Sequence, residues 1–138
     1  MTKETLYRFI ASKELAVLGS VSAGGTPECA LVGIAVTAEL EIVFDTVNTS
    51  RKYRNLLRNP EAALVIGWEN EITVQYEGTA RELGSTELPR FQEVYFARWP
   101  ECRAHLTWPG IAYFVVKPRW IRYSDFNEGS RGVVEMKF

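Results

Sequence analysis

The sequence predicts a mainly β protein, a small antiparallel barrel of about six strands with two or three short helices inserted. Several short segments are rich in β-branched residues or alternate between apolar and polar residues, which is typical of strands. The turns between the early strands are too short for parallel crossovers, so the sheet is expected to be antiparallel. The 138 residues, 46% of them apolar, suit one domain over 1–138, and a single domain with this many strands is expected to close into a barrel.

The N-terminal half is expected to hold a helix, three strands and a second helix. These elements lie, in order, at residues 2–13, 15–21, 28–36, 41–46 and 50–59. The first helix has Thr2 as its N-cap and an apolar face that begins with Leu6. A glycine-rich turn before Pro27 joins the first two strands. Ser50 is a good N-cap for the second helix, which Pro60 ends because the residue before a proline avoids the helical conformation.

The C-terminal half is expected to hold two strands, a helix, a loop and a last strand. These elements lie, in order, at residues 62–67, 71–83, 85–98, 100–110 and 111–123. The first of these strands is nearly all apolar, whereas the second alternates, and Gly78 marks a bulge or bend in it. Leu88 and Phe91 begin the apolar face of the helix. The tail after Asp125 is polar and gives no clear structural prediction.

Charge and composition exclude several classes of function. The chain has 16 basic and 17 acidic residues, so its net charge of −1 offers no general field for nucleic acid or an anionic membrane. Two cysteines, Cys29 and Cys102, and the single His105 exclude a disulfide framework and leave few ligands for a Cys/His metal site. The apolar runs are too short to span a bilayer and the N-terminus does not read as a signal peptide, so a cytoplasmic protein is expected.

The most informative segment, residues 48–60, contains four cations and no acid. Two of the cations, Arg51 and Lys52, fall in the first turn of the expected helix, where the helix dipole disfavours positive charge. Free backbone N–H groups point out of the same helix end, beside the hydroxyl of Ser50. This combination predicts an anion site that a phosphate group fits. A solvated basic helix face is the alternative, and the residues alone leave both open.

The remaining candidates are less specific. Thirteen of the 17 aromatic residues, including all four tryptophans, lie from Trp68 onward, where they could line a ring-binding cleft, a dimer interface or simply the core. Cys29 is expected to be a small buried apolar residue. Arg103 and His105 could lower the pKa of the Cys102 thiol, although a Cys-x-x-His pattern is common by chance. The sequence has no nucleophile motif and no dinucleotide fingerprint, so redox chemistry would need a bound cofactor.

Three stretches resemble the pyridoxamine 5'-phosphate oxidase-like family of FMN-binding split barrels. They are Val-Phe-Asp-Thr ending at Thr46, Thr-Ser-Arg-Lys ending at Lys52, and Asn-Pro-Glu-Ala-Ala-Leu-Val beginning at Asn59. The flanking elements follow the family's order, so the resemblance covers about residues 2–126. It implies a six-stranded Greek-key split barrel that forms a homodimer, with FMN at each end of the interface. The implied function is an FMN-dependent oxidoreductase that transfers hydride to or from an unknown small substrate.

The resemblance also implies which residues bind the cofactor. These are Val32, Gly33, Asp45, Thr46, Ser50, Arg51, Lys52 and Thr73. Arg51 and Lys52 would hold the FMN phosphate, and Asp45 and Thr46 would lie along the ribityl chain or the ring. The second strand would pass the isoalloxazine ring through backbone groups. Thr73 stands where the founding oxidases often have a glutamine that reaches the cofactor.

The chain departs from the founding oxidases at groups that hold pyridoxal phosphate and the flavin ring. Ala30 and Ala35 replace an arginine and a lysine, Ser124 stands where a tryptophan is usual, and the C-terminal Arg-Leu-His-Asp-Arg segment is missing. A more apolar pocket and a substrate other than pyridoxamine phosphate are therefore expected. The alternatives are a deazaflavin- or haem-binding split barrel, or a non-catalytic flavin-binding protein. No residue stands out as a catalytic acid or base.

Overall fold

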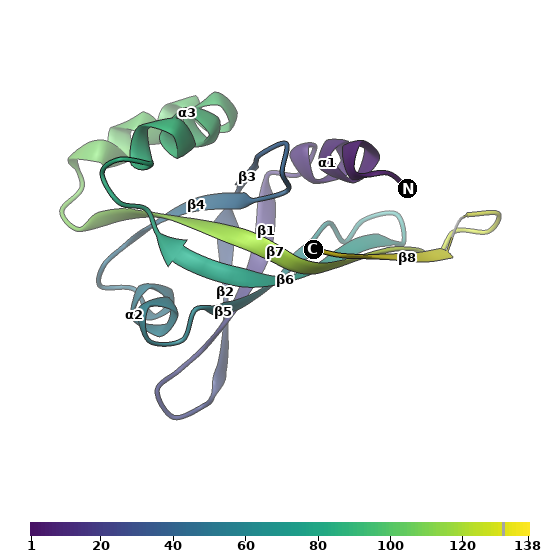
Figure 1. Ribbon diagram of the computed structural model, residues 1–138, viewed down its shortest axis with the longest axis horizontal. Coiled ribbons are helices and arrows are strands. Elements are labelled where there is room, and N and C mark those ends of the chain that lie inside the picture. The colour runs from purple at the N-terminus through teal and green to yellow at the C-terminus, as the bar shows by residue number, and fades with distance from the viewer. Residues whose placement is uncertain (131) are drawn as a thin grey trace.

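Figure 1 shows the computed structural model, which describes residues 1–130 and 132–138. The strands are β1 (Leu15–Val21), β2 (Pro27–Gly33), β3 (Ala35–Val36), β4 (Ile42–Val47), β5 (Glu61–Ile66), β6 (Ile72–Glu82), β7 (Ile111–Asp125) and β8 (Gly132–Lys137). The helices are α1 (Lys3–Ala11), α2 (Arg51–Arg58), α3 (Leu88–Arg98) and the 3-10 helix η1 (Pro100–Thr107). All the strand pairs are antiparallel, in the order β2-β1-β5-β6-β7-β4-β3, and β8 also pairs with β7. The predicted class, a mainly antiparallel split barrel with a few short helices, is confirmed.

The second predicted strand is divided at Ile34 into β2 and β3. The reason is that β2 pairs with β1 at one end of the strand order, whereas β3 pairs with β4 at the opposite end. At the break, the Ile34 N–H donates to the Glu14 carbonyl at 2.9 Å, and its carbonyl accepts from Nε1 of Trp99 at 2.9 Å. Both backbone groups of Ile34 are therefore satisfied outside the strand ladders.

The tail after Asp125 forms β8, which extends the sheet beyond the barrel (Figure 1). The Ser130 hydroxyl donates to the Asp125 carbonyl at 2.7 Å and helps to close the turn. The 15-residue strand β7 pairs along one edge with β6. Its other edge pairs first with β4 and then with β8. The predicted loop at residues 100–110 likewise contains regular structure, the helix η1.

The core has two parts, one on each side of β4 and β7. Inside the barrel, the rings of Phe44 and Phe114 stack at a centroid distance of 5.5 Å, and α1 adds Leu6 and Ile10. On the other side, α3 packs Phe91 and its neighbours against the outward residues of the same two strands. The run at residues 112–116 is continuously apolar because successive side chains face these two different cores.

Gly78 forms the predicted bulge. The β6–β7 register shifts between Glu77 and Gly78, and a Cβ atom at Gly78 would collide with the Lys117 carbonyl. The missing side chain lets β7 cross β6 closely at this point, which bends the pair of strands.

Tyr76 supports a prediction about stability. Its side chain is 1% exposed, and its hydroxyl lies 2.8 Å from the Leu40 carbonyl and 2.9 Å from the Val116 carbonyl. Tyr76→Phe removes this shared donor from two buried carbonyls, and we expect unfolding to become easier by about 1–3 kcal/mol in urea denaturation. Tyr53→Phe is the control, because the Tyr53 hydroxyl contacts Glu82 in solvent and its loss should change much less. Equal effects of the two variants would contradict the prediction.

Candidate functional site

The start of α2 has the geometry of an anion site. Ser50 caps the helix, since its Oγ accepts the N–H of Tyr53 at 3.2 Å. The same hydroxyl lies 2.8 Å from the hydroxyl of Thr46 on β4, which fixes the helix start against the sheet. The N–H groups of Arg51 and Lys52 have no acceptor within the helix, as at every helix N-terminus. Four of the eight predicted cofactor residues therefore meet here.

Each of the two cations at this helix start has an acidic neighbour on a strand, Glu28 on β2 or Asp45 on β4. Nη1 of Arg51 lies 3.1 Å from Oε2 of Glu28, whose other oxygen accepts from Nδ2 of Asn55 at 2.8 Å. Lys52 is half-buried close to Asp45. Burial lowers the pKa of Lys52, and the charge of Asp45 opposes part of that shift. The helix start is therefore less positive than the sequence of residues 48–60 indicates.

Asp45 also joins two side chains that the sequence did not connect with the site. Nδ1 of His105 lies 2.6 Å from Oδ2 of Asp45, and the Tyr95 hydroxyl donates to Oδ1 at 3.2 Å. Burial, followed by the charge of Asp45, raises the pKa of Tyr95 far above its usual value, which keeps the hydroxyl a donor. The His105 ring stacks on Trp108 at a centroid distance of 3.9 Å. With Nδ1 directed to the carboxylate, Nε2 of a neutral ring carries the available lone pair.

A close contact ties this histidine segment to the helix start. The carbonyl of Gly110, three residues beyond Thr107, accepts the N–H of Asn48 at 2.8 Å. Gly110 has a φ of +75°, and a Cβ atom there would collide with the Asn48 side chain. Glycine is required at this corner for both reasons.

The structure places the two cysteines in different environments. Cys29 is exposed rather than buried, because in β2 it shares the outward face with Leu31, whereas Val32 faces the core. Cys102 is buried, and burial raises the pKa of its thiol although a hydrogen bond with Tyr95 opposes the shift. Burial therefore acts against the lowering of this pKa that Arg103 and His105 could cause.

Trp99 covers the end of β2, where the resemblance places the cofactor ring. A Cβ atom at Gly33 would lie 3.1 Å from Cζ2 of Trp99, so the indole contacts the glycine backbone directly. The Nε1–H bond to the Ile34 carbonyl holds the indole in that position. Val32, the neighbouring predicted residue, points into the core and offers only its backbone. The result is an aromatic surface beside β2, which no local sequence pattern predicted.

Thr73 does not reach the helix start within one protomer. It lies near the beginning of β6, whereas Glu82 at the other end contacts Tyr53 of α2. Nine positions of extended strand separate the two by about 30 Å. Thr73 alternates with the core-facing residues and so shares the outer face of β6 with Gln75 and Glu77.

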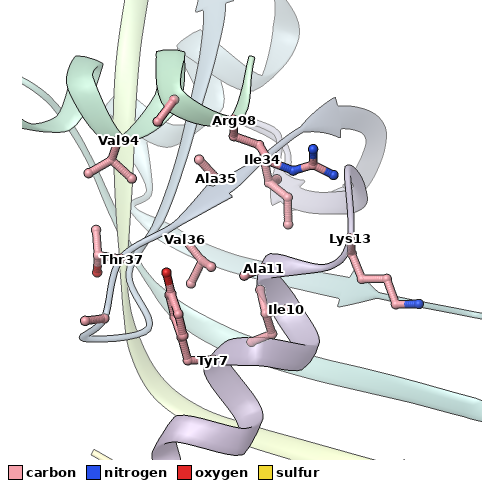
Figure 2. A pocket seen from close by; sticks show the side chains of 12 residues that line it. Tyr7, Ile10, Ala11, Lys13, Ile34, Ala35, Val36, Thr37, Val94 and Arg98 are labelled. Carbon is pink, nitrogen blue, oxygen red and sulfur yellow. The ribbon is translucent and has the colours of Figure 1, made fainter. Parts of the chain in front are cut away.

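A cavity of about 440 Å³ lies apart from the predicted cofactor residues, between α1, β3 and α3 (Figure 2). Ile34 and Ala35 line it, but none of the eight predicted positions does. Within residues 1–130 and 132–138, no group of three or more His, Cys, Asp or Glu side chains could hold a metal ion. In the same residues, no helix is long and apolar enough to cross a membrane.

Comparison with known proteins confirms the family. A family model described as pyridoxamine 5'-phosphate oxidase matches residues 2–125. The chain belongs to the pyridoxamine 5'-phosphate oxidase family. A curated member, the pyridoxine/pyridoxamine 5'-phosphate oxidase of Burkholderia mallei, is 35% identical over 99 residues. That match covers 71% of this chain and 44% of the curated protein, so it spans less than half of the relative's length.

Solved structures share the fold of this chain. A heme binding protein from Mycobacterium smegmatis superposes with a TM-score of 0.82 at 16% identity, covering 99% of this chain and 58% of that chain. General stress protein 26 from Bacillus anthracis superposes with a TM-score of 0.72 at 19% identity, covering 99% of this chain and 98% of that chain. At these identities the likeness concerns the fold alone.

Proposed function

We propose that this protein binds FMN at the start of α2 and acts as a flavin-dependent oxidoreductase. The observation that carries the proposal is the helix start itself, where Ser50, Arg51 and Lys52 present a hydroxyl, two cations and free N–H groups in a member of this family. Arg51 and Lys52 would hold the phosphate, and Asp45 and Thr46 lie beside them on β4. Bound FMN supplies hydride transfer, and the protein positions the ring.

The substrate that this site favours is a small molecule without a phosphate group. Ala30 and Ala35 offer no cation beside β2, and the Trp99 indole covers the strand end at Gly33. An aromatic and aliphatic surface binds an apolar ring or chain better than a dianion. True pyridoxamine 5'-phosphate oxidation is therefore not part of the proposal.

A homodimer belongs to the same proposal. The outer face of β2, β1, β5 and β6 carries the exposed side chains of Leu31 and Val65, at 60% and 39% exposure. Beside Val65 on the same face, Gly19 and Ala63 leave a hollow of about 260 Å³. A second copy of the chain would bury this apolar face. It would also bring a Thr73 from the same face toward the site of its partner, which one protomer cannot do.

Haem is a second candidate cofactor, favoured by the contact between His105 and Asp45. A histidine that ligates a metal commonly directs its other ring nitrogen to a carboxylate, as Nδ1 of His105 does at 2.6 Å. The structural neighbour from Mycobacterium smegmatis is named a heme binding protein. The exposed fraction of the His105 side chain, 23%, leaves its ring accessible.

The visible spectrum tests these cofactors directly. We expect two bands near those of free flavin, either in the purified protein or after FMN is added. Titration with FMN, a deazaflavin and haemin then ranks the three ligands on the same sample. Binding of haemin or of the deazaflavin without FMN binding at micromolar concentration would overturn the FMN proposal.

Glu28 supports a prediction about FMN affinity. Its carboxylate competes with a phosphate for Arg51, so Glu28→Gln should tighten FMN binding about threefold to tenfold. The glutamine still offers an oxygen to Asn55, so the local structure should remain. Glu135→Gln, which removes an acid from β8, is the matched control and should leave the affinity unchanged. Weaker FMN binding by Glu28→Gln would show that the carboxylate positions Arg51 instead of competing for it.

A further inference from the structure

We propose that the cavity between α1, β3 and α3 binds a small amphipathic carboxylate, a monoanion with an apolar body. The cavity borders the proposed flavin and substrate site at Ala35 but contains none of the eight predicted cofactor residues, so the proposal goes beyond the FMN site. The charge and the polarity of its walls carry the assignment.

The greater part of the cavity wall is apolar. Its volume of about 440 Å³ falls in the range of small-molecule sites, about 300–1,000 Å³. Helix α1, the β3 region and helix α3 supply the apolar wall, with Ile10, Ala11, Ile34, Val36, Val94 and Ala97. Figure 2 shows that the labelled side chains among them come from all three elements. A hydrocarbon chain or an unsubstituted ring fits such a wall, because burying it removes apolar surface from water.

Two cations, Lys13 and Arg98, line one side of this cavity, but the ammonium group of Lys13 lies over the Phe9 ring, 4.9 Å from its centroid, outside the cavity wall. Figure 2 shows Lys13 and Arg98 on the same side of the view, whereas Tyr7 and Thr37 lie on the other. No acidic residue lines the cavity among the described residues. Glu14 lies 3.5 Å from Arg98 outside the wall, and its side chain is 63% exposed. Arg98 therefore supplies the positive charge at one end of the wall, which Glu14 offsets in part, and uncharged hydroxyl groups stand at the other end.

Arg98 also has an unused donor. Its Nε is buried and has no hydrogen-bond partner, although such a group normally finds one. Its guanidinium carbon lies 5.8 Å from the ring centroid of Trp99, which helps to hold the group at the rim. A carboxylate that enters beside Arg98 would supply an acceptor and form charge-assisted hydrogen bonds.

The helix ends favour one negative charge over two. Arg98 is the last residue of α3, and Lys13 follows the end of α1 at Ala11. The partial negative charge at both helix C-termini stabilises these cations and lowers the net positive charge that an anionic ligand meets. A phosphate dianion therefore finds less compensation here than at the start of α2, whereas a carboxylate is matched. This difference separates the two sites by chemistry.

Calorimetric titration with decanoate tests the proposal, at concentrations well below those that form micelles. We expect decanoate to bind the protein equally with and without added FMN, and decanol to bind about tenfold more weakly. Arg98→Gln should weaken decanoate binding about tenfold, since a charge-assisted contact is lost. Ala97→Phe fills the cavity from an exposed helix position and should abolish binding.

Arg90→Gln is the matched control on the same helix, outside the cavity, and should bind decanoate like the natural chain. Thermal melting by circular dichroism establishes that each variant is folded. Absence of decanoate binding, equal binding of decanoate and decanol, or unchanged binding in Arg98→Gln or Ala97→Phe would each overturn the proposal. FMN titration of the same samples gives a separate answer on the cofactor, so failure of one proposal is distinguishable from failure of the other.

Discussion

Replacing Lys52 with alanine is expected to weaken FMN binding about tenfold to a hundredfold, and Arg51→Ala should have a similar effect. Each residue would form charge-assisted hydrogen bonds with the phosphate, which contribute about 1.5–3 kcal/mol each. The folded structure should change little, because cations at a helix start do not stabilise the helix. Quenching of flavin fluorescence on titration measures the affinity.

Riboflavin, which lacks the phosphate, is the control ligand for these variants. Its binding should hardly change in Lys52→Ala or Arg51→Ala. Arg54 and Arg58 are the control positions on the same helix, where Arg54 already donates to the Thr49 carbonyl at 2.9 Å. Alanine at Arg54 or Arg58 should leave FMN affinity intact. Equal FMN affinity in all four single variants would remove the helix start as the phosphate site and favour a solvated basic face.

Placing a glutamate at Val65 is expected to convert the proposed dimer into monomers. Val65 lies on the outer face with its partners Val17 on β1 and Gln75 on β6, so the new charge would be buried without a counter-ion. The natural chain should form a dimer that buries about 2,000 Å² or more, the size of stable homodimer interfaces. Light scattering at micromolar concentration measures the mass of both proteins.

The same variant should lose FMN affinity, because Thr73 would then reach no partner site. Val133→Glu is the matched control, since Val133 is 49% exposed on β8, which lies outside the proposed interface. It should remain dimeric and keep its FMN affinity. A monomeric natural chain would contradict both the dimer and the shared site.

Local patterns predicted most of the fold, and the errors arose where distant segments meet. Alternation and β-branched runs identified six strand regions, and Gly78 marked a real bulge. At the division, the Ile34 carbonyl is satisfied by Trp99, which lies 65 positions further along the chain. The last strand, β8, was not predicted because half of its residues are exposed. Its strand conformation depends on its pairing with β7. The turn-forming Gly129 and the two valines after Gly132 were the available signal for this hairpin.

The same division between local and distant contacts holds for the site. Ser50, Arg51 and Lys52 are neighbours in sequence, so the helix start could be identified from residue types alone. Glu28 lies 23 positions before its partner Arg51. His105 lies 60 positions after its partner Asp45. No sequence periodicity predicts such contacts, because only tertiary packing brings β2, β4 and η1 together. The error at Cys29 has another cause: the prediction placed this side chain on the inward face of its strand, whereas it lies on the outward face.

The contact between Gly110 and Asn48 makes the η1 segment and the start of α2 one mechanical unit. Asn48 stands two residues before Ser50, and its N–H is held by a carbonyl from the chain that carries His105 and Trp108. An outward displacement of η1 must therefore pull on the helix cap or break this hydrogen bond first. Either route frees the Asn48 amide, so its hydrogen exchange with solvent records how often the histidine segment separates from the helix start.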